Sequence, residues 1–169
     1  MRQDRSVPAD IAAAVKCDLA GEVLRSFGSL RFAATGWSML PAIWPGDTLV
    51  VERVNRDQIQ VGEVVLVGRD GRLCAHRVVS RAESSGSPQW TTQGDAMPAP
   101  DRPVIEPELL GRVSHLIRAG NCIAVAGELS LVAKLVARIV RRWFPAARAL
   151  VYLRRMVQAS EESVLPCQG

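Results

Sequence analysis

The pattern of apolar and polar residues changes twice along the chain. Up to residue 28, apolar residues recur every three to four positions, which predicts one helix of about five turns that ends at Gly28. From residue 30 to residue 125 the apolar runs are short, rich in valine and separated by Gly, Pro, Asn and Asp, as in antiparallel β proteins. After Gly127 the helical period returns, with cationic residues on the polar side.

The middle region is predicted to hold seven strands. They span residues 30–35, 47–54, 63–68, 72–82, 89–93, 109–118 and 121–126. Asp70-Gly71 and Ala119-Gly120 have the composition of tight hairpin turns, so the strands that they join are antiparallel. We predict a mainly β fold, with an antiparallel, coiled and barrel-like sheet in residues 30–127. A helix in residues 1–29 precedes it, and a basic amphipathic helical tail in residues 128–169 follows it.

The tail differs from the rest of the chain in charge. The protein has 21 basic and 17 acidic residues, but residues 128–155 contain seven cations and one acid, Glu128. A basic amphipathic helix either packs on its own domain, meets another copy, or lies on a membrane with its arginines toward anionic headgroups. The aromatic residues Trp143, Phe144 and Tyr152 favour the membrane, so we expect a peripheral membrane contact through residues 128–157.

Several classes of protein are disfavoured. One helix before the β region leaves no room for a helix-turn-helix, so no nucleic-acid partner is expected. Neither an apolar signal segment nor a run of about 18 uncharged apolar residues is visible, which favours the cytoplasm or the inner face of a membrane. With two histidines and no clustered carboxylates, we expect neither a metal site nor a cofactor. Without Cys-x-x-Cys spacing the cysteines are expected to be reduced thiols: Cys17, Cys74, Cys122 and Cys167.

Ser38 is the candidate nucleophile. It stands between Gly36 and Pro41, on a segment that we expect to be bent and extended, so that its hydroxyl is exposed. A serine hydroxyl reacts only when a base takes its proton. The only two lysines, Lys16 and Lys134, belong to the predicted helices.

His76 is the candidate base, because it lies in the β region, in the strand after the Asp-Gly turn. His115, in a later strand, is the alternative. A histidine base needs an acceptor on its second ring nitrogen, which fixes the tautomer. Asp95 and Asp101 both lie in the loop after the next strand, and the sequence leaves open which of them takes this role.

Taken in order, these motifs resemble those of type I signal peptidases. The series runs Gly36-Trp37-Ser38-Met39-Leu40-Pro41, Trp44-Pro45-Gly46-Asp47, Val61-Gly62-Glu63-Val64-Val65, Ala75-His76-Arg77-Val78-Val79, Gly94-Asp95 with Asp101, and Gly111-Arg112-Val113. Many members of the wider superfamily, which includes self-cleaving repressors of the LexA kind, have a lysine where this chain has His76. The chain is more similar to the branch that uses serine and histidine, which comprises the endoplasmic-reticulum, archaeal and sporulation-type enzymes.

The resemblance implies that Ser38 attacks the scissile carbonyl, that His76 moves the proton, and that Asp95 or Asp101 orients His76. The backbone N–H of Ser38 would stabilise the oxyanion, and the substrate would lie along Gly36, Met39 and Pro41. Substrates would be extended peptides with small side chains before the cut.

The chain departs from the family in three ways. Gly36 stands where the family often has a second oxyanion donor, Ala96 and Met97 stand where asparagine is common, and no N-terminal membrane helix is visible. We therefore expect a dedicated serine endopeptidase that acts on the leader or signal-like segment of a precursor. Two alternatives stay open: a LexA-like regulator that cleaves itself, with Ala20-Gly21 as a possible site, and a catalytically silent membrane-associated binding module.

Overall fold

The computed structural model describes residues 9–84, 86–125, 127 and 130–142. The elements are α1 (Ala9–Phe27), β1 (Ser29–Ala33), β2 (Thr48–Glu52), β3 (Val64–Arg69), β4 (Arg72–Ser84), β5 (Ser87–Gln93), β6 (Leu109–Arg118), β7 (Asn121–Ala124) and α2 (Leu131–Arg142), with two short 3-10 turns at Arg56–Gln58 and Glu106–Glu108. The expected segment 146–157 lies outside the described residues, as do Trp143, Phe144, Tyr152 and Cys167.

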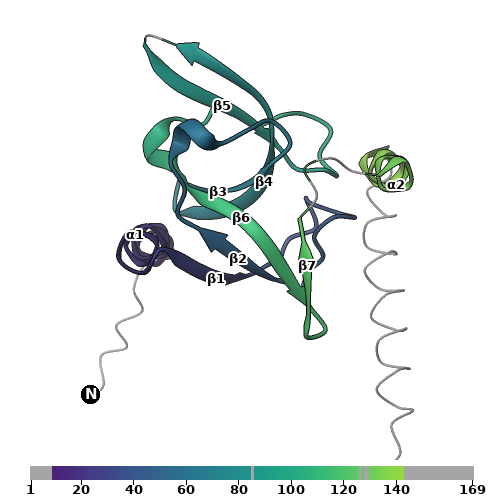
Figure 1. Cartoon of the computed structure of the whole chain (residues 1–169), viewed down its shortest axis with the longest axis horizontal. Coiled ribbons are helices and arrows are strands. Elements are labelled where there is room, and N and C mark those ends of the chain that lie inside the picture. The colour runs from purple at the N-terminus through teal and green to yellow at the C-terminus, as the bar shows by residue number, and fades with distance from the viewer. Residues whose placement is uncertain (1–8, 85, 126, 128–129, 143–169) are drawn as a thin grey trace, which may run out of the picture.

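The seven strands form one antiparallel sheet in the order β1-β2-β6-β3-β4-β5, with β7 paired to β6 (Figure 1). This confirms the mainly β class and all seven predicted strands, whose ends differ from the prediction by at most two residues. The barrel-like expectation needs correction, because the sheet is not closed: β1 and β5 are its two ends and each pairs with a single neighbour.

The sheet curves because its long strands change partners along their length. The first part of β4, residues 72–77, pairs with β3, and the second part, residues 77–84, pairs with β5. β6 similarly pairs with β3, β2 and β7 in turn, and its ladders with β3 and β2 each contain a register shift. Such irregularities bend a strand and increase its twist, which brings loops from distant parts of the sequence together.

β3 separates the two main parts of the core. Val64 and Leu66 face one apolar cluster, which also receives Leu24 of α1, and Val65 and Val67 face the other, around Trp90. Successive side chains of a strand point to opposite faces. The continuous apolar run of β3 is therefore explained by burial on both sides.

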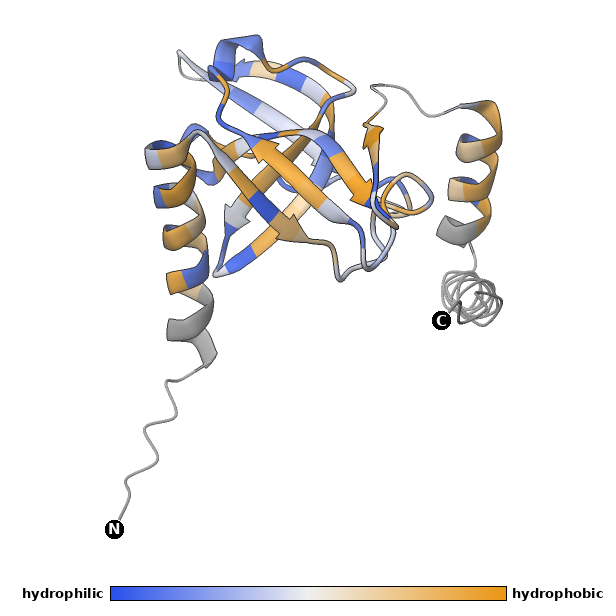
Figure 2. Cartoon of the chain, turned by 60° about the horizontal axis from the view of Figure 1, so that its bottom comes forward, coloured by the Kyte–Doolittle hydropathy of each residue, from blue (hydrophilic) through white to orange (hydrophobic). Residues whose placement is uncertain are grey.

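The two helices lie on opposite sides of the sheet (Figures 1 and 2). α1 ends at Gly28, whose φ of +74° favours glycine and whose N–H donates to the Leu24 carbonyl at 3.1 Å. α2 begins after Ser130, whose hydroxyl accepts the Ala133 N–H at 3.2 Å. Of the helices that the structure describes, none is long and apolar enough to cross a membrane.

Only some of the large apolar residues of α1 lie on the face that packs against the sheet. Val15, Leu19 and Phe27 are 55%, 60% and 78% exposed, whereas Ala20 and Leu24 are buried. The packed face of α1 combines one large residue, Leu24, with the small residues Ala20 and Gly21. The apolar period predicted the helix, but it did not predict the contact surface.

Candidate active site

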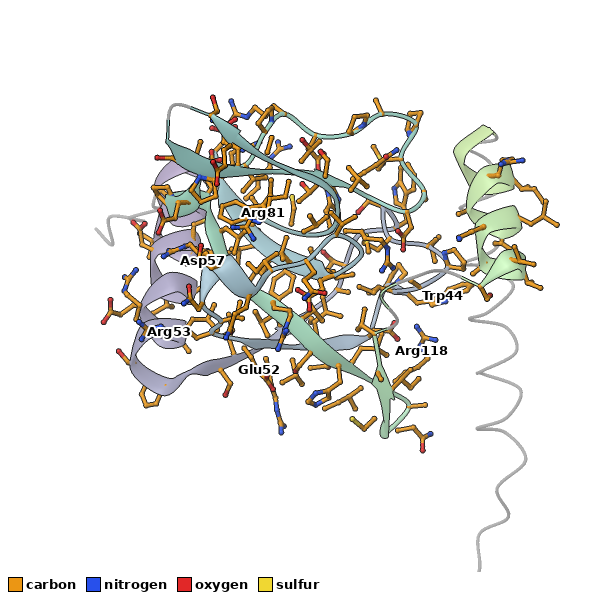
Figure 3. The ribbon with its side chains drawn as sticks, turned by 45° about the horizontal axis from the view of Figure 1, so that its top comes forward. Trp44, Glu52, Arg53, Asp57, Arg81 and Arg118 are labelled. Atoms are coloured by element: carbon orange, nitrogen blue, oxygen red, sulfur yellow. The ribbon has the colours of Figure 1, made fainter. Side chains whose placement is uncertain are left out.

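Ser38 lies in the loop between β1 and β2, and this loop is tied to the sheet through Asp47. The Asp47 carboxylate accepts the Trp44 N–H at 2.7 Å and two hydrogen bonds from Arg118 at 2.9 and 2.6 Å. Asp47 is only 3% exposed, so its charge is matched by a cation within the fold. Arg118 lies at the end of β6, so the loop is fixed to a strand 71 residues further along the chain (Figure 3).

The backbone around Ser38 is a turn and not the bent, extended segment that the sequence suggested. Leu40 N–H donates to the Trp37 carbonyl at 3.1 Å, and Ile43 N–H donates to the Met39 carbonyl at 3.0 Å. These two bonds wind residues 37–43 into consecutive turns. The Ser38 hydroxyl stays accessible, because the residue is only partly buried.

A second loop, after β5, contacts the candidate nucleophile Ser38. Ala96 N–H donates to the Ser38 carbonyl at 2.8 Å, and Met97 N–H donates to the Gly94 carbonyl at 2.8 Å. A Cβ atom at Gly94 would lie 2.7 Å from the Ser38 carbonyl oxygen and 3.0 Å from the Ser38 Cβ. Only glycine therefore allows this approach.

His76 connects Ser38 to Asp101. His76 Nε2 lies 3.0 Å from Ser38 Oγ, and His76 Nδ1 lies 2.6 Å from Asp101 Oδ2. An ionised aspartate accepts only, so Nδ1 carries the proton and Nε2 is left as the acceptor for the serine hydroxyl. Because the His76 side chain is only 12% exposed, both hydrogen bonds are partly shielded from water.

Thr92 of β5 fixes the Asp101 carboxylate. Its hydroxyl donates to Asp101 Oδ2 at 2.7 Å, and its carbonyl accepts the Asp101 N–H at 2.8 Å. Burial by itself would raise the pKa of Asp101, but hydrogen bonds from His76 and Thr92 and the charges of His76 and Arg69 outweigh burial and leave this pKa below its ordinary value. The carboxylate therefore stays ionised at neutral pH.

Asp95 has a different partner. Arg77 donates to both of its oxygens, each at 2.8 Å, and the two side chains are 10% and 5% exposed. The same guanidinium donates to the carbonyls of Gly62 at 2.7 Å and Gly127 at 3.2 Å. Of the two aspartates that the sequence left open, Asp101 contacts His76 and Asp95 contacts the neighbouring Arg77.

The remaining candidates are distributed around this centre. Gly36 and Met39 line a hollow beside Ser38, whereas Pro41 is half-buried and does not line it. The other histidine, His115, lies on β6 with Nδ1 3.0 Å from the hydroxyl of its neighbour Ser114. Sequence reasoning assigned no individual role to Thr92, Asp47 or Gly94, although Asp47 and Gly94 belong to the motif series and Thr92 lies three residues before Asp95.

Two hollows flank the Ser38–His76 pair. The one beside Ser38 has a volume of about 170 Å³, and its wall is mostly apolar: Phe32, Ala34, Met39, Ile43, Leu49, Leu73 and Ala75. The other, of about 380 Å³, begins at His76 and Asp101 and extends along β4 to Arg72. Cys74 is exposed and lines both hollows. Among the described residues, no three His, Cys, Asp or Glu side chains are grouped so as to hold a metal ion.

Comparison with models of protein families and with curated proteins gave no match for this chain.

Proposed function

We propose that this protein is a serine endopeptidase similar to the type I signal peptidases that use histidine. The observation that carries the proposal is the position of His76, which lies between the Ser38 hydroxyl and the Asp101 carboxylate at 3.0 and 2.6 Å. A serine, a histidine and an aspartate in this order have the geometry required for nucleophilic acyl transfer.

Each residue has a definite role in the proposed reaction. His76 Nε2 takes the proton of Ser38 as Oγ forms a bond to the scissile carbonyl carbon. The protonated ring then gives this proton to the leaving amine, the C–N bond breaks and an acyl-serine remains. Asp101 holds the tautomer and stabilises the imidazolium. In the second half, His76 activates a water molecule that releases the acyl group.

The Ser38 N–H is the proposed oxyanion donor. Within the described residues it makes no backbone hydrogen bond, so it is available to a developing negative charge. Donors of this kind contribute about 3 to 4 kcal/mol to the stability of the transition state. Ala96 N–H, which holds the Ser38 carbonyl at 2.8 Å, fixes the orientation of the peptide unit that follows Ser38.

The proposed substrate is an extended peptide with a small apolar residue before the cut. The hollow beside Ser38 is smaller than typical pockets for organic ligands and has a mostly apolar wall. In the described chain, residues 72–76 of β4 pair only with β3, so their second edge is available to a peptide strand. Leu73 and Ala75, which line the hollow, belong to this stretch, so a strand added there would run past Ser38.

The LexA-like alternative receives less support. Self-cleavage after Ala20 would require the Ala20-Gly21 bond to reach Ser38 in an extended form, but both residues lie within α1 and are buried. A cut there would need the last two turns of this helix to unfold. The silent binding module predicts no reaction at Ser38, so a direct test of the nucleophile distinguishes it from the enzyme.

The test is acyl transfer from a small activated ester, followed by peptide cleavage. We expect p-nitrophenyl acetate to acetylate Ser38, as mapped by mass spectrometry, and we expect a set of Ala-x-Ala peptides to be cut after the second alanine. Ser38→Ala and His76→Ala should abolish both reactions. Ser114→Ala is the matched control, because Ser114 also lies 3.0 Å from a histidine. Acetylation that survives Ser38→Ala, or is lost with Ser114→Ala, would contradict the proposal.

A further inference from the structure

The apolar surface of α2 is divided between two faces. Val136 packs on the cluster formed by Leu40 and Ala96 with Trp37 and Trp44, and the neighbouring Ala137 is 3% exposed. Figure 3 shows Trp44 on the side of the domain that faces α2. The second apolar face is largely exposed and is formed by Leu131, Val132, Leu135 and Ile139, which are 85%, 72%, 58% and 52% exposed.

A membrane surface is the simplest environment in which the side chains of this second face would be removed from water. Apolar residues cover much of α2 in Figure 2. Of these residues, Val136 packs against the domain. Four large aliphatic side chains exposed within nine residues form a contiguous apolar strip, since positions three and four apart are neighbours on a helix. A contiguous apolar strip that is exposed on the surface of a protein marks an interaction site.

The charge of α2 indicates which surface it meets. Its twelve residues include four cations, Lys134, Arg138, Arg141 and Arg142, and no acid. α1 provides a comparison within the same molecule, because it exposes Val15 and Leu19 but carries three acids and two cations. A cationic helix with an exposed apolar face matches a bilayer with anionic headgroups, whereas two copies of α2 facing each other would bring like charges together.

We propose that α2 binds the surface of an anionic phospholipid bilayer through Leu131, Val132, Leu135 and Ile139. The helix lies parallel to the surface, with these side chains among the acyl chains and with Lys134 and Arg138 at the headgroups. Leu40, which packs with Val136, is two residues from Ser38, so the bound helix holds the nucleophile loop close to the bilayer. If the proposed peptidase function is correct, substrates at the membrane surface are cut in preference to free peptides.

Vesicle co-sedimentation of the full chain tests the surface without reference to catalysis. We expect binding to vesicles of phosphatidylglycerol and phosphatidylcholine, and much weaker binding to phosphatidylcholine alone. Leu135→Ser with Ile139→Ser should weaken binding by at least about tenfold, because less apolar area is buried. Lys134→Gln with Arg138→Gln should weaken it by about 25-fold on anionic vesicles, since each cation contributes about fivefold. Val15→Ser with Leu19→Ser on α1 is the control that should not change it.

Three results would overturn the proposal. The first is no binding of the folded full chain to anionic vesicles. The second is equal binding to neutral and anionic vesicles, which would remove the role of the cations. The third is a stable dimer, measured by analytical ultracentrifugation, that the Leu135 and Ile139 changes dissociate, since a second copy would then cover the face. Acetylation of Ser38 in the same preparations is a separate measurement, so failure of membrane binding and failure of the peptidase proposal are distinguishable.

Discussion

Arg77 and Asp95 form a buried ion pair with two hydrogen bonds, each 2.8 Å long, immediately beside the candidate base. Arg77 follows His76 in β4, and Asp95 follows the glycine that contacts Ser38. The pair therefore connects the strand that carries the candidate base to the loop that contacts the candidate nucleophile. Its role is structural, since the acceptor of the His76 ring is Asp101.

Asp95→Ala should lower the free energy of unfolding by about 3 to 5 kcal/mol, because it removes the carboxylate that balances the charge of the buried Arg77 guanidinium. Urea unfolding followed by circular dichroism measures the change. The matched control is Arg102→Ala, which removes the exposed pair with Asp70 and should cost no more than about 1 kcal/mol. If Asp95→Ala stopped acyl transfer and left stability unchanged, Asp95 would act in the chemistry.

Asp101→Asn should reduce the rate of Ser38 acetylation by roughly 10² to 10⁴, because the amide neither fixes the tautomer nor stabilises the imidazolium. The fold should be retained, since Asp101 is partly exposed. Stopped-flow measurement of p-nitrophenol release gives the rate.

Thr92→Val is a milder change at the same carboxylate. It removes one hydrogen bond to the same carboxylate and should slow acetylation by about tenfold. A Thr92→Val effect as large as that of Asp101→Asn would contradict a supporting role for Thr92. Thr92→Ser keeps a hydroxyl and should restore most of the rate.

Acid should destabilise the wild-type protein partly through Asp101. The pKa of this carboxyl is lower in the folded chain than in the unfolded chain, so its contribution to stability is complete above the unfolded pKa of about 4 and is lost as the pH falls through the folded pKa. Between about pH 6 and pH 3, Asp101→Asn should lose less stability than the wild type. Parallel curves of unfolding free energy against pH would show that Asp101 is not linked to folding.

Gly94→Ala should slow acetylation by about 10², because the added Cβ displaces the Ser38 carbonyl and with it the nucleophile. Gly21→Ala is the control. A Cβ at Gly21 has no neighbour closer than 3.5 Å and lies within α1, so this change should leave the rate unaltered and stabilise the helix by up to about 1 kcal/mol. Equal rates for Gly94→Ala and the wild type would mean that the loop after β5 does not position Ser38.

The sequence predicted the strands well because valine-rich runs and turn residues are local signals. Closure of the sheet depends on where strands exchange partners, as β4 does at Arg77, and no local pattern encodes this. The apolar period of α1 likewise did not predict which of its residues are buried, since Val15 and Leu19 are exposed whereas Ala20 and Leu24 are buried.

Only the outline of the candidate site could be predicted from the sequence. The sequence favoured a histidine as the base, because both lysines belong to predicted helices, and it kept His115 as the alternative to His76. The choice between the two aspartates depended on Arg77, which takes Asp95 and leaves Asp101 for the ring. Such competition among side chains is decided by three-dimensional distance, so spacing along the chain could not resolve it.

The position of Cys74 allows ligand binding at the candidate site to be measured without following a reaction. Its thiol is exposed, lies two residues from His76 and lines both hollows, so a fluorophore attached there would report occupancy of either side of the Ser38–His76 pair. Partial burial and the nearby Asp101 charge raise the pKa of this thiol, so attachment is faster at alkaline pH. With such a label on the Ser38→Ala variant, peptides and the products of their cleavage could be ranked by their affinity for the site.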